Sequence, residues 1–144
     1  GYTLNSTGPT DGLATTGGVS IINVDTGIAA RLNTPISGTA GLTKTGAGSV
    51  IWAAGSATFA LGAGSLIDLQ EGVFGGGANA NENWTNNLAG LNVASGAIFN
   101  GVEANVRVDA LTGAGTVWYD VVCNIWLAAA KPRSASPKRP SRRI

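Results

Sequence analysis

Short apolar runs separated by glycine-rich turns recur along the whole chain. The runs are four to six residues long and rich in Val, Ile, Leu and Ala, and clusters of Gly, Thr, Ser and Asn separate them. Runs of this length between turn residues are typical of β-strands and are too short to span a membrane as a helix. We therefore expect strands at residues 19–24, 28–32, 36–37, 50–52, 58–61, 66–69, 91–93, 97–99, 104–108 and 116–119.

Apolar and polar residues alternate over residues 103–110. Such alternation places apolar side chains on one face of a strand and polar side chains on the other. The inward residues of this segment are Ala104, Val106, Val108 and Ala110, and the outward ones are Glu103, Asn105, Arg107 and Asp109. The same rule predicts one continuous core lined by Ile22, Val24, Val50, Trp52, Phe59, Leu61, Ile67, Leu69, Leu91, Val93, Val106 and Val108.

One motif repeats at a long and nearly constant spacing. Residues 41–48 read Gly-Leu-Thr-Lys-Thr-Gly-Ala-Gly and lead into an apolar strand, and a shortened copy occupies 111–118. Residues 22–27 also match 91–96, so the two matches lie 67 and 69 residues apart. A coil of three short strands and their turns spans roughly 22 residues, so three coils fit this spacing. We expect a stack of about five or six coils, with strands paired at about 4.8 Å.

The composition agrees with this all-β architecture. The chain has 144 residues, with 22 glycines and neither methionine nor histidine. Its polar residues are mainly Thr, Ser and Asn, which favour strands and turns, and its length gives no reason for a second domain. We expect residues 1–18 to form a frayed or incomplete first coil and residues 19–118 to form the coils, with an irregular loop at about 75–87.

Composition and charge both change near Trp118. Every glycine lies at or before Gly115, the last fourteen residues carry six cations and no acid, and residues 1–130 have a net charge of −5. We expect 119–144 to be a basic tail outside the fold, and we interpret it as the product of a reading-frame shift or a misjoined gene end. Apolar residues between 121 and 127 would cover the open edge of the last coil as a short strand or helix. Residues 131–144 offer neither a folded basic face nor interleaved aromatic residues, so we expect no nucleic-acid partner.

Residues 41–50 resemble the autotransporter-associated β-strand repeat, which occurs in secreted passenger domains of bacterial surface proteins. That repeat typically reads Gly-Leu-Thr-Lys-x-Gly-x-Gly-Thr-Leu. Residues 56–59 match its continuation only loosely, and the second copy lacks the Lys-Thr pair. The resemblance implies a right-handed parallel β-helix and export to the cell surface of a Gram-negative-type bacterium. It further implies flanking coils and a translocator domain. It transfers no catalytic residues, because the motif is structural.

The chain also starts at Gly1 without a signal segment, so we interpret it as a fragment or a processed product.

Enzymatic chemistry has little support in the sequence. A hydrolytic triad lacks its usual base because there is no histidine, and the single cysteine, Cys123, excludes an internal disulfide. The glycine turns lead into strands rather than helices, so they do not fit a nucleotide-binding fingerprint. Two carboxylate pairs remain possible, Asp68 with Glu71 and Glu103 with Asp109. We expect no catalysis, no cofactor and no bound metal.

Two segments are candidates for ligand contact. The loop at 75–87 contains Trp84 and Asn86, and a tryptophan beside asparagines suits stacking on a sugar ring, although a lone tryptophan that covers the base of a loop is commoner. This loop weakly resembles calcium-binding repeats but offers asparagines where those repeats need aspartates. The outward row Glu103, Asn105, Arg107 and Asp109 would suit a polysaccharide lyase, although a solvated strand face explains it more simply.

The sequence thus predicts a non-catalytic structural or adhesive segment of an exported bacterial surface protein. Its expected partners are surface glycans or host and matrix proteins, and we expect no membrane span in this segment. Two alternatives remain open. One is a carbohydrate-active β-helix enzyme that uses the 103–109 face, and the other is a phage or envelope fibre in which the coils act as a spacer.

Overall fold

A computed structural model describes residues 1–8, 11–52, 58–76, 84, 86–101, 105–118 and 124–127. These residues form strands and turns, without a helix. The strands are β1 (Tyr2–Asn5), β2 (Leu13–Thr15), β3 (Ser20–Asn23), β4 (Ala29–Asn33), β5 (Ile36–Gly38), β6 (Leu42–Thr45), β7 (Ser49–Trp52), β8 (Phe59–Leu61), β9 (Leu66–Leu69), β10 (Val73–Gly76), β11 (Gly90–Val93), β12 (Ile98–Asn100), β13 (Asn105–Val108), β14 (Leu111–Gly113), β15 (Thr116–Trp118) and β16 (Asn124–Leu127).

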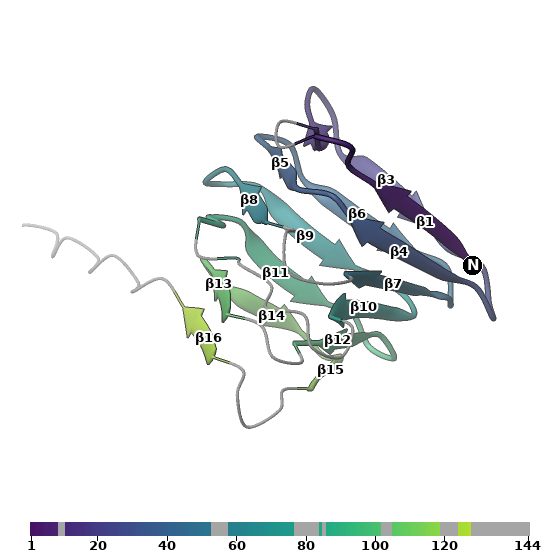
Figure 1. Cartoon of the computed structure of the whole chain (residues 1–144). Helices are drawn as coiled ribbons and strands as arrows, with labels where there is room; N and C mark the ends of the chain where they lie inside the picture. Colours follow the sequence, from purple (N-terminus) through teal and green to yellow (C-terminus); the bar gives the residue numbers. More distant parts are fainter. Residues whose placement is uncertain are drawn as a thin grey trace, which may run out of the picture.

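The strands wind into a parallel β-solenoid with three faces (Figure 1). Face A stacks β1, β4, β7, β10, β12 and β15, and face C stacks β3, β6, β9, β11 and β14. Face B stacks β2, β5 and β8 and, after an interruption among the described residues, continues with β13 and β16. The chain visits the faces in the order A, B, C, and four of its turns carry a strand on every face among the described residues. The predicted all-β parallel solenoid is confirmed.

Asn87 bridges the interruption of face B. Its side chain is fully buried, its Oδ1 accepts the Leu61 N–H of β8 at 3.2 Å, and its Nδ2 donates to the Arg107 carbonyl of β13 at 2.8 Å. The backbone completes the connection, since the Leu88 N–H donates to the Leu61 carbonyl at 2.8 Å. The Asp109 N–H donates to the Ala89 carbonyl at 2.9 Å. A side-chain amide therefore takes the place of a strand's peptide group between β8 and β13.

The sequence repeat corresponds to coils with the same geometry. In the turn at 24–28 the Ile28 N–H donates to the Asp25 carbonyl at 3.0 Å, and in the turn at 93–97 the Ala97 N–H donates to the Ala94 carbonyl at the same distance. A glycine with positive φ precedes the donor in both turns, Gly27 at +77° and Gly96 at +84°. The turns at 46–48 and 113–115 lie one coil later and bond back to these turns. The Gly48 N–H donates to the Val24 carbonyl at 2.9 Å, and the Gly115 N–H donates to the Val93 carbonyl at 2.8 Å. The matched strands lie three positions apart on face C, as the spacing predicts.

The core follows the predicted alternation closely. Ten of the predicted inward residues are at most 4 % exposed, namely Val24, Val50, Phe59, Leu61, Ile67, Leu69, Leu91, Val93, Val106 and Val108. Ile22 is only half-buried, because β3 is the first strand of its face. Ala110 is exposed, contrary to expectation, because β13 ends at Val108. Ala104 and the side chain of Trp52 lie outside the described residues.

Several strands form where the apolar pattern did not predict them. β6 and β14 lie within the two copies of the glycine motif, and β10 includes two glycines of the expected loop at 75–87. β1 and β2 pair with β4 and β5, so residues of the expected frayed first coil form part of the stack. β16 pairs in parallel with β13, so Asn124–Leu127 form a short strand at the open edge of the last coil, as expected for the apolar residues between 121 and 127. Backbone groups at an open edge accept any extended segment, whatever its composition. The other residues of the predicted tail lie outside the described residues.

Candidate functional site

Trp84 lies in the core and not on the surface. It is 1 % exposed and stacks on Phe59 with ring centroids 4.4 Å apart and an angle of 15°. Phe99 and Phe74 meet it edge-on at 5.6 and 6.4 Å. Trp84 therefore presents no exposed face for stacking on a sugar ring, because its ring fills the interior beside β8. Asn86 is exposed. Residues 77–83 and 85 of the expected loop lie outside the described residues.

The predicted row at 103–109 is only partly described. Arg107 is half-buried on β13 and Asp109 is exposed just after it. Glu103 and the side chain of Asn105 lie outside the described residues. The structure therefore does not show these four side chains assembled into a groove.

Asp68, in the other candidate carboxylate pair, is held by two amide side chains. Asp68 lies on the outer side of β9, where its Oδ1 accepts from Asn92 Nδ2 at 2.7 Å and its Oδ2 accepts from Gln70 Nε2 at 2.9 Å. Glu71 follows in the turn after β9 and is exposed. Two amides thus occupy both oxygens of Asp68, and these hydrogen bonds hold it in a polar surface row.

A buried ammonium group joins two successive coils at the corner between faces C and A. Lys44 in β6 is 1 % exposed, and its Nζ donates to the Thr45 carbonyl at 2.9 Å and to the Gly46 carbonyl. It also donates to the Glu71 carbonyl of the next coil at 3.0 Å. Burial lowers the pKa of Lys44, and the charge of Glu71 opposes this shift. Three carbonyl acceptors and almost no solvent access make this lysine a structural cap.

The inward position of Lys44 was missed because lysine is normally exposed. Its register partners are Ile22 on β3 and Leu69 on β9, so its stem occupies an inward column of apolar residues. The signal was present in the sequence, since Lys44 is in phase with the buried Leu42 two positions earlier.

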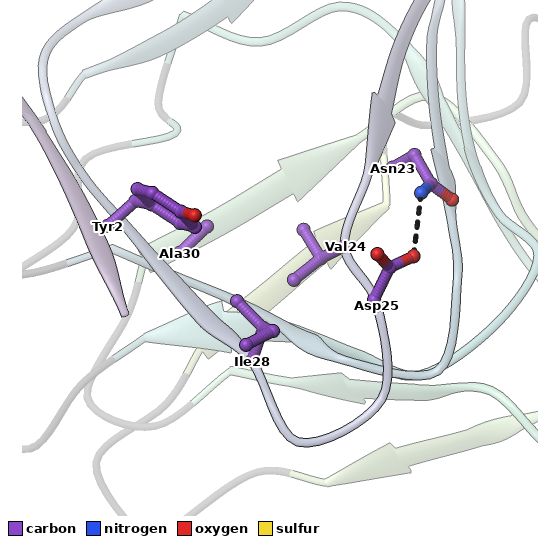
Figure 2. Close-up of a pocket in the computed structure, with 6 residues that line it drawn as sticks. All are labelled: Tyr2, Asn23, Val24, Asp25, Ile28 and Ala30. Atoms are coloured by element: carbon purple, nitrogen blue, oxygen red, sulfur yellow. Dashed lines mark hydrogen bonds between the residues drawn. The ribbon is translucent and has the colours of Figure 1, made fainter.

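Two cavities lie at the end of the solenoid formed by β1, β2 and β3. The larger one, about 260 Å³, is bounded by β1, by the turn between β3 and β4, and by β4 (Figure 2). Its lining residues are Tyr2, Asn23, Val24, Asp25, Ile28 and Ala30.

Polar groups fix one rim of this larger cavity. Tyr2 stands on one side, and Asn23 and Asp25 stand opposite it (Figure 2). Asn23 Nδ2 donates to Asp25 Oδ1 at 3.1 Å, while Asn23 Oδ1 accepts from Thr45 Oγ1 at 3.0 Å. The rim is therefore held by a short hydrogen-bond chain that continues onto β6.

The smaller cavity, about 170 Å³, lies between β2 and β3. Its lining residues are Leu13, Ala14, Thr15, Ser20, Ile21, Ile22, Ile36 and Leu42. Both cavities thus flank β3, the first strand of face C. The sequence did not indicate them, because they arise where a stack of strands ends.

Other site types find no support within the described ranges. No group of three or more metal-binding side chains occurs there, and no helix there is long and apolar enough to cross a membrane. Comparisons with protein-family models, with curated proteins and with solved structures found no match to this chain.

Proposed function

We propose that this chain is a non-catalytic structural segment of an exported bacterial surface protein of the autotransporter-passenger type. Its coils would extend the protein away from the cell and present polar side chains to glycans or matrix proteins. The proposal rests mainly on the roles of the residues in the repeat motif. Leu42 lies in the core, Lys44 joins two coils, and Gly46 turns the chain with φ of +75°. A Cβ on Gly48 would collide with the Asp25 carbonyl of the preceding turn.

Leu42, Lys44, Gly46 and Gly48 therefore contribute to stacking one coil on the next. A motif of this kind suits a rigid extended segment, in which every coil contacts only its neighbours.

The surface that suits contact best is the outer side of face C. Thr43, Asp68, Asn92 and Thr112 occupy one register column across four strands. Thr112 Oγ1 donates to Asn92 Oδ1 at 3.1 Å, and Asn92 in turn bonds to Asp68. A continuous row of hydroxyl, amide and carboxylate groups can exchange hydrogen bonds with a hydrated, hydroxyl-rich ligand such as a glycan.

The test is display on a host bacterium, with the chain placed between an export signal and an outer-membrane anchor. Cells should bind an immobilised glycan or matrix protein, and the double change Thr43→Val and Thr112→Val should weaken binding without loss of protease resistance. Ser37→Ala on the exposed side of face B is the matched control and should have no effect. Equal binding by the two variants would exclude face C as the contact surface.

The same material distinguishes the two alternatives. Release of unsaturated sugars from an acidic polysaccharide, abolished by Arg107→Ala, would establish the enzyme and overturn the proposal. A stable threefold assembly with no adhesion would instead favour the fibre.

A further inference from the structure

Asp68 is the charged member of the outer row that it forms on face C with Thr43, Asn92 and Thr112. Its Oδ1 accepts a hydrogen bond from Asn92 Nδ2 at 2.7 Å, and its Oδ2 accepts one from Gln70 Nε2 at 2.9 Å. A carboxylate offers about four acceptor positions, so roughly two remain for a ligand. The two amides therefore hold this half-buried carboxylate in place and leave it able to accept further hydrogen bonds.

No basic side chain accompanies Asp68 on the outer side of face C in the described strands. The strands of this face contain one basic residue, Lys44, which points inward and donates to the Glu71 carbonyl. The other described basic residues lie on different faces, Arg31 on β4 of face A and Arg107 on β13 of face B. Amides, and not a described cation, therefore hold the charge of Asp68.

Further acids flank the same face. Exposed carboxylates lie in the connections at the ends of its strands, namely Asp25 after β3, Glu71 after β9 and Asp109 before β14. The buried ammonium of Lys44 offsets part of the charge of Glu71. With Asp68 included, four carboxylates stand against this one ammonium. The potential over the outer side of face C is therefore negative, and it attracts cationic ligands.

The spacing of the row suits a linear polymer laid across the strands. Neighbouring strands lie about 4.8 Å apart, so such a polymer would meet a hydroxyl, a carboxylate, an amide and a second hydroxyl in turn. Hydroxyl and amide groups bond to the hydroxyls of any sugar. The carboxylate distinguishes ligands by charge, because hydrogen bonds with an ionised partner are roughly twice as strong as neutral ones. An ammonium matches it best, and a second carboxylate is repelled.

We propose that the outer row of face C selects a glycan with free amino groups, such as an oligomer of glucosamine, over N-acetylated and acidic glycans. The inference rests on the proposed function and names the class of its ligand. The ammonium of one sugar donates to Asp68, while hydroxyls of the adjoining sugars bond to Thr43, Asn92 and Thr112.

The experiment compares two oligomers of equal length, one of glucosamine and one of N-acetylglucosamine, by isothermal titration calorimetry with the full chain. These ligands share the same sugar ring and differ in carrying an ammonium or an acetamide. Mildly acidic buffer keeps the amino groups charged, and low salt limits screening. The glucosamine oligomer should bind at least about tenfold more tightly, and added salt should reduce this preference.

One pair of variants assigns the preference to a residue. Asp68→Asn removes the charge at nearly constant side-chain size and should bring the two affinities within about twofold of each other. Asp11→Asn is the matched control, because it removes the same charge from the connection between β1 and β2 and should leave the preference intact. If Asp68→Asn impairs folding, the comparison of the two oligomers on the wild-type chain still decides.

The outcomes separate this inference from the proposed function. Equal affinity for the two oligomers, no binding of the glucosamine oligomer, or tighter binding of polygalacturonate would overturn the inference. The proposed function would survive any of these results if cells displaying the chain adhere to a neutral glycan through Thr43 and Thr112. Absence of adhesion to every glycan and matrix protein would overturn both.

Discussion

Face C and face B are built from the same chain but depend on different kinds of interaction. Face C stacks β3, β6, β9, β11 and β14 without interruption, so each inner strand is held by backbone bonds on both sides. In the part of the chain that the structure describes, face B has no strand between β8 and β13, and there the amide of Asn87 links the two strands while the ring of Trp84 packs on Phe59. A regular face spreads its stability over many equivalent backbone groups. The interrupted face concentrates it in two side chains.

Trp84→Ala should have the largest effect on this comparison. The ring contacts Phe59, Phe74 and Phe99, and removing it leaves a cavity under the interrupted face. We expect a loss of about 3–5 kcal/mol in the free energy of unfolding, measured by chemical denaturation. Trp84→Phe keeps an aromatic ring in place and should lose clearly less. A loss of stability equal to that of an exposed substitution would contradict the core position of Trp84.

Asn87→Leu tests whether one amide replaces a strand. The substitution preserves side-chain volume but removes the hydrogen bonds to the Leu61 N–H and the Arg107 carbonyl, at a cost of about 2–4 kcal/mol. The matched control is Asn92→Leu on the outer side of face C. It should change the free energy of unfolding by about 0.5 kcal/mol, because backbone pairing there is intact. Similar losses for the two variants would show that face B does not depend on Asn87.

Val106→Asp and Arg107→Ala compare the inward and outward sides of one strand of the interrupted face. Val106 is fully buried, so an aspartate there carries an unpaired charge into the core. We expect the free energy of unfolding to fall by about 3 kcal/mol, and by less at a pH where the aspartate is protonated. Arg107 is half-buried, so Arg107→Ala should lower the free energy of unfolding by less than Val106→Asp. Thermal melting of both variants would reveal the difference, and equal small losses would refute the assigned facing of β13.

Lys44→Met examines the corner that stabilises the regular face. Methionine keeps most of the stem in its apolar column but leaves three carbonyls without their donor. We expect a loss of about 1–2 kcal/mol, because relief from burying a charge offsets part of the cost. Hydrogen exchange should accelerate mainly in the turns after β6 and β9. Uniform acceleration over face B would contradict a local role.

The pH dependence of the contribution of Lys44 to stability should be the smallest of these effects. Burial lowers the pKa of Lys44 in the folded chain below the value of 10.5 that applies without burial. The unfolded chain therefore binds more protons between the two values, so the contribution of Lys44 to stability rises as the pH increases through that window. Denaturation of the wild-type chain and of Lys44→Met across this range isolates the difference, since both share all other titrating groups. A contribution that falls with pH would have the wrong sign.

Local chemistry in the sequence determined the strand-and-turn rhythm, the three-coil repeat and most inward positions. In a strand, inward and outward side chains alternate with a period of two residues, as at Val106 and Val108. A turn that needs positive φ selects glycine, as at Gly27 and Gly96. These properties depend on residues close together in the chain. They could therefore be predicted without knowledge of the neighbouring coils.

Only the tertiary structure decided that Trp84, Lys44 and Asn87 are buried. Trp84 fills the core, Lys44 caps carbonyls of two coils, and Asn87 links β8 to β13. Each has a partner 25 to 27 residues away in the chain, namely Phe59 for Trp84, Glu71 for Lys44 and Leu61 for Asn87. The cavities beside β3 have the same origin, because a cavity at the end of a stack depends on which strands lie beside it. A buried polar group is stable only when distant atoms supply its hydrogen bonds, and the fold alone brings those atoms together.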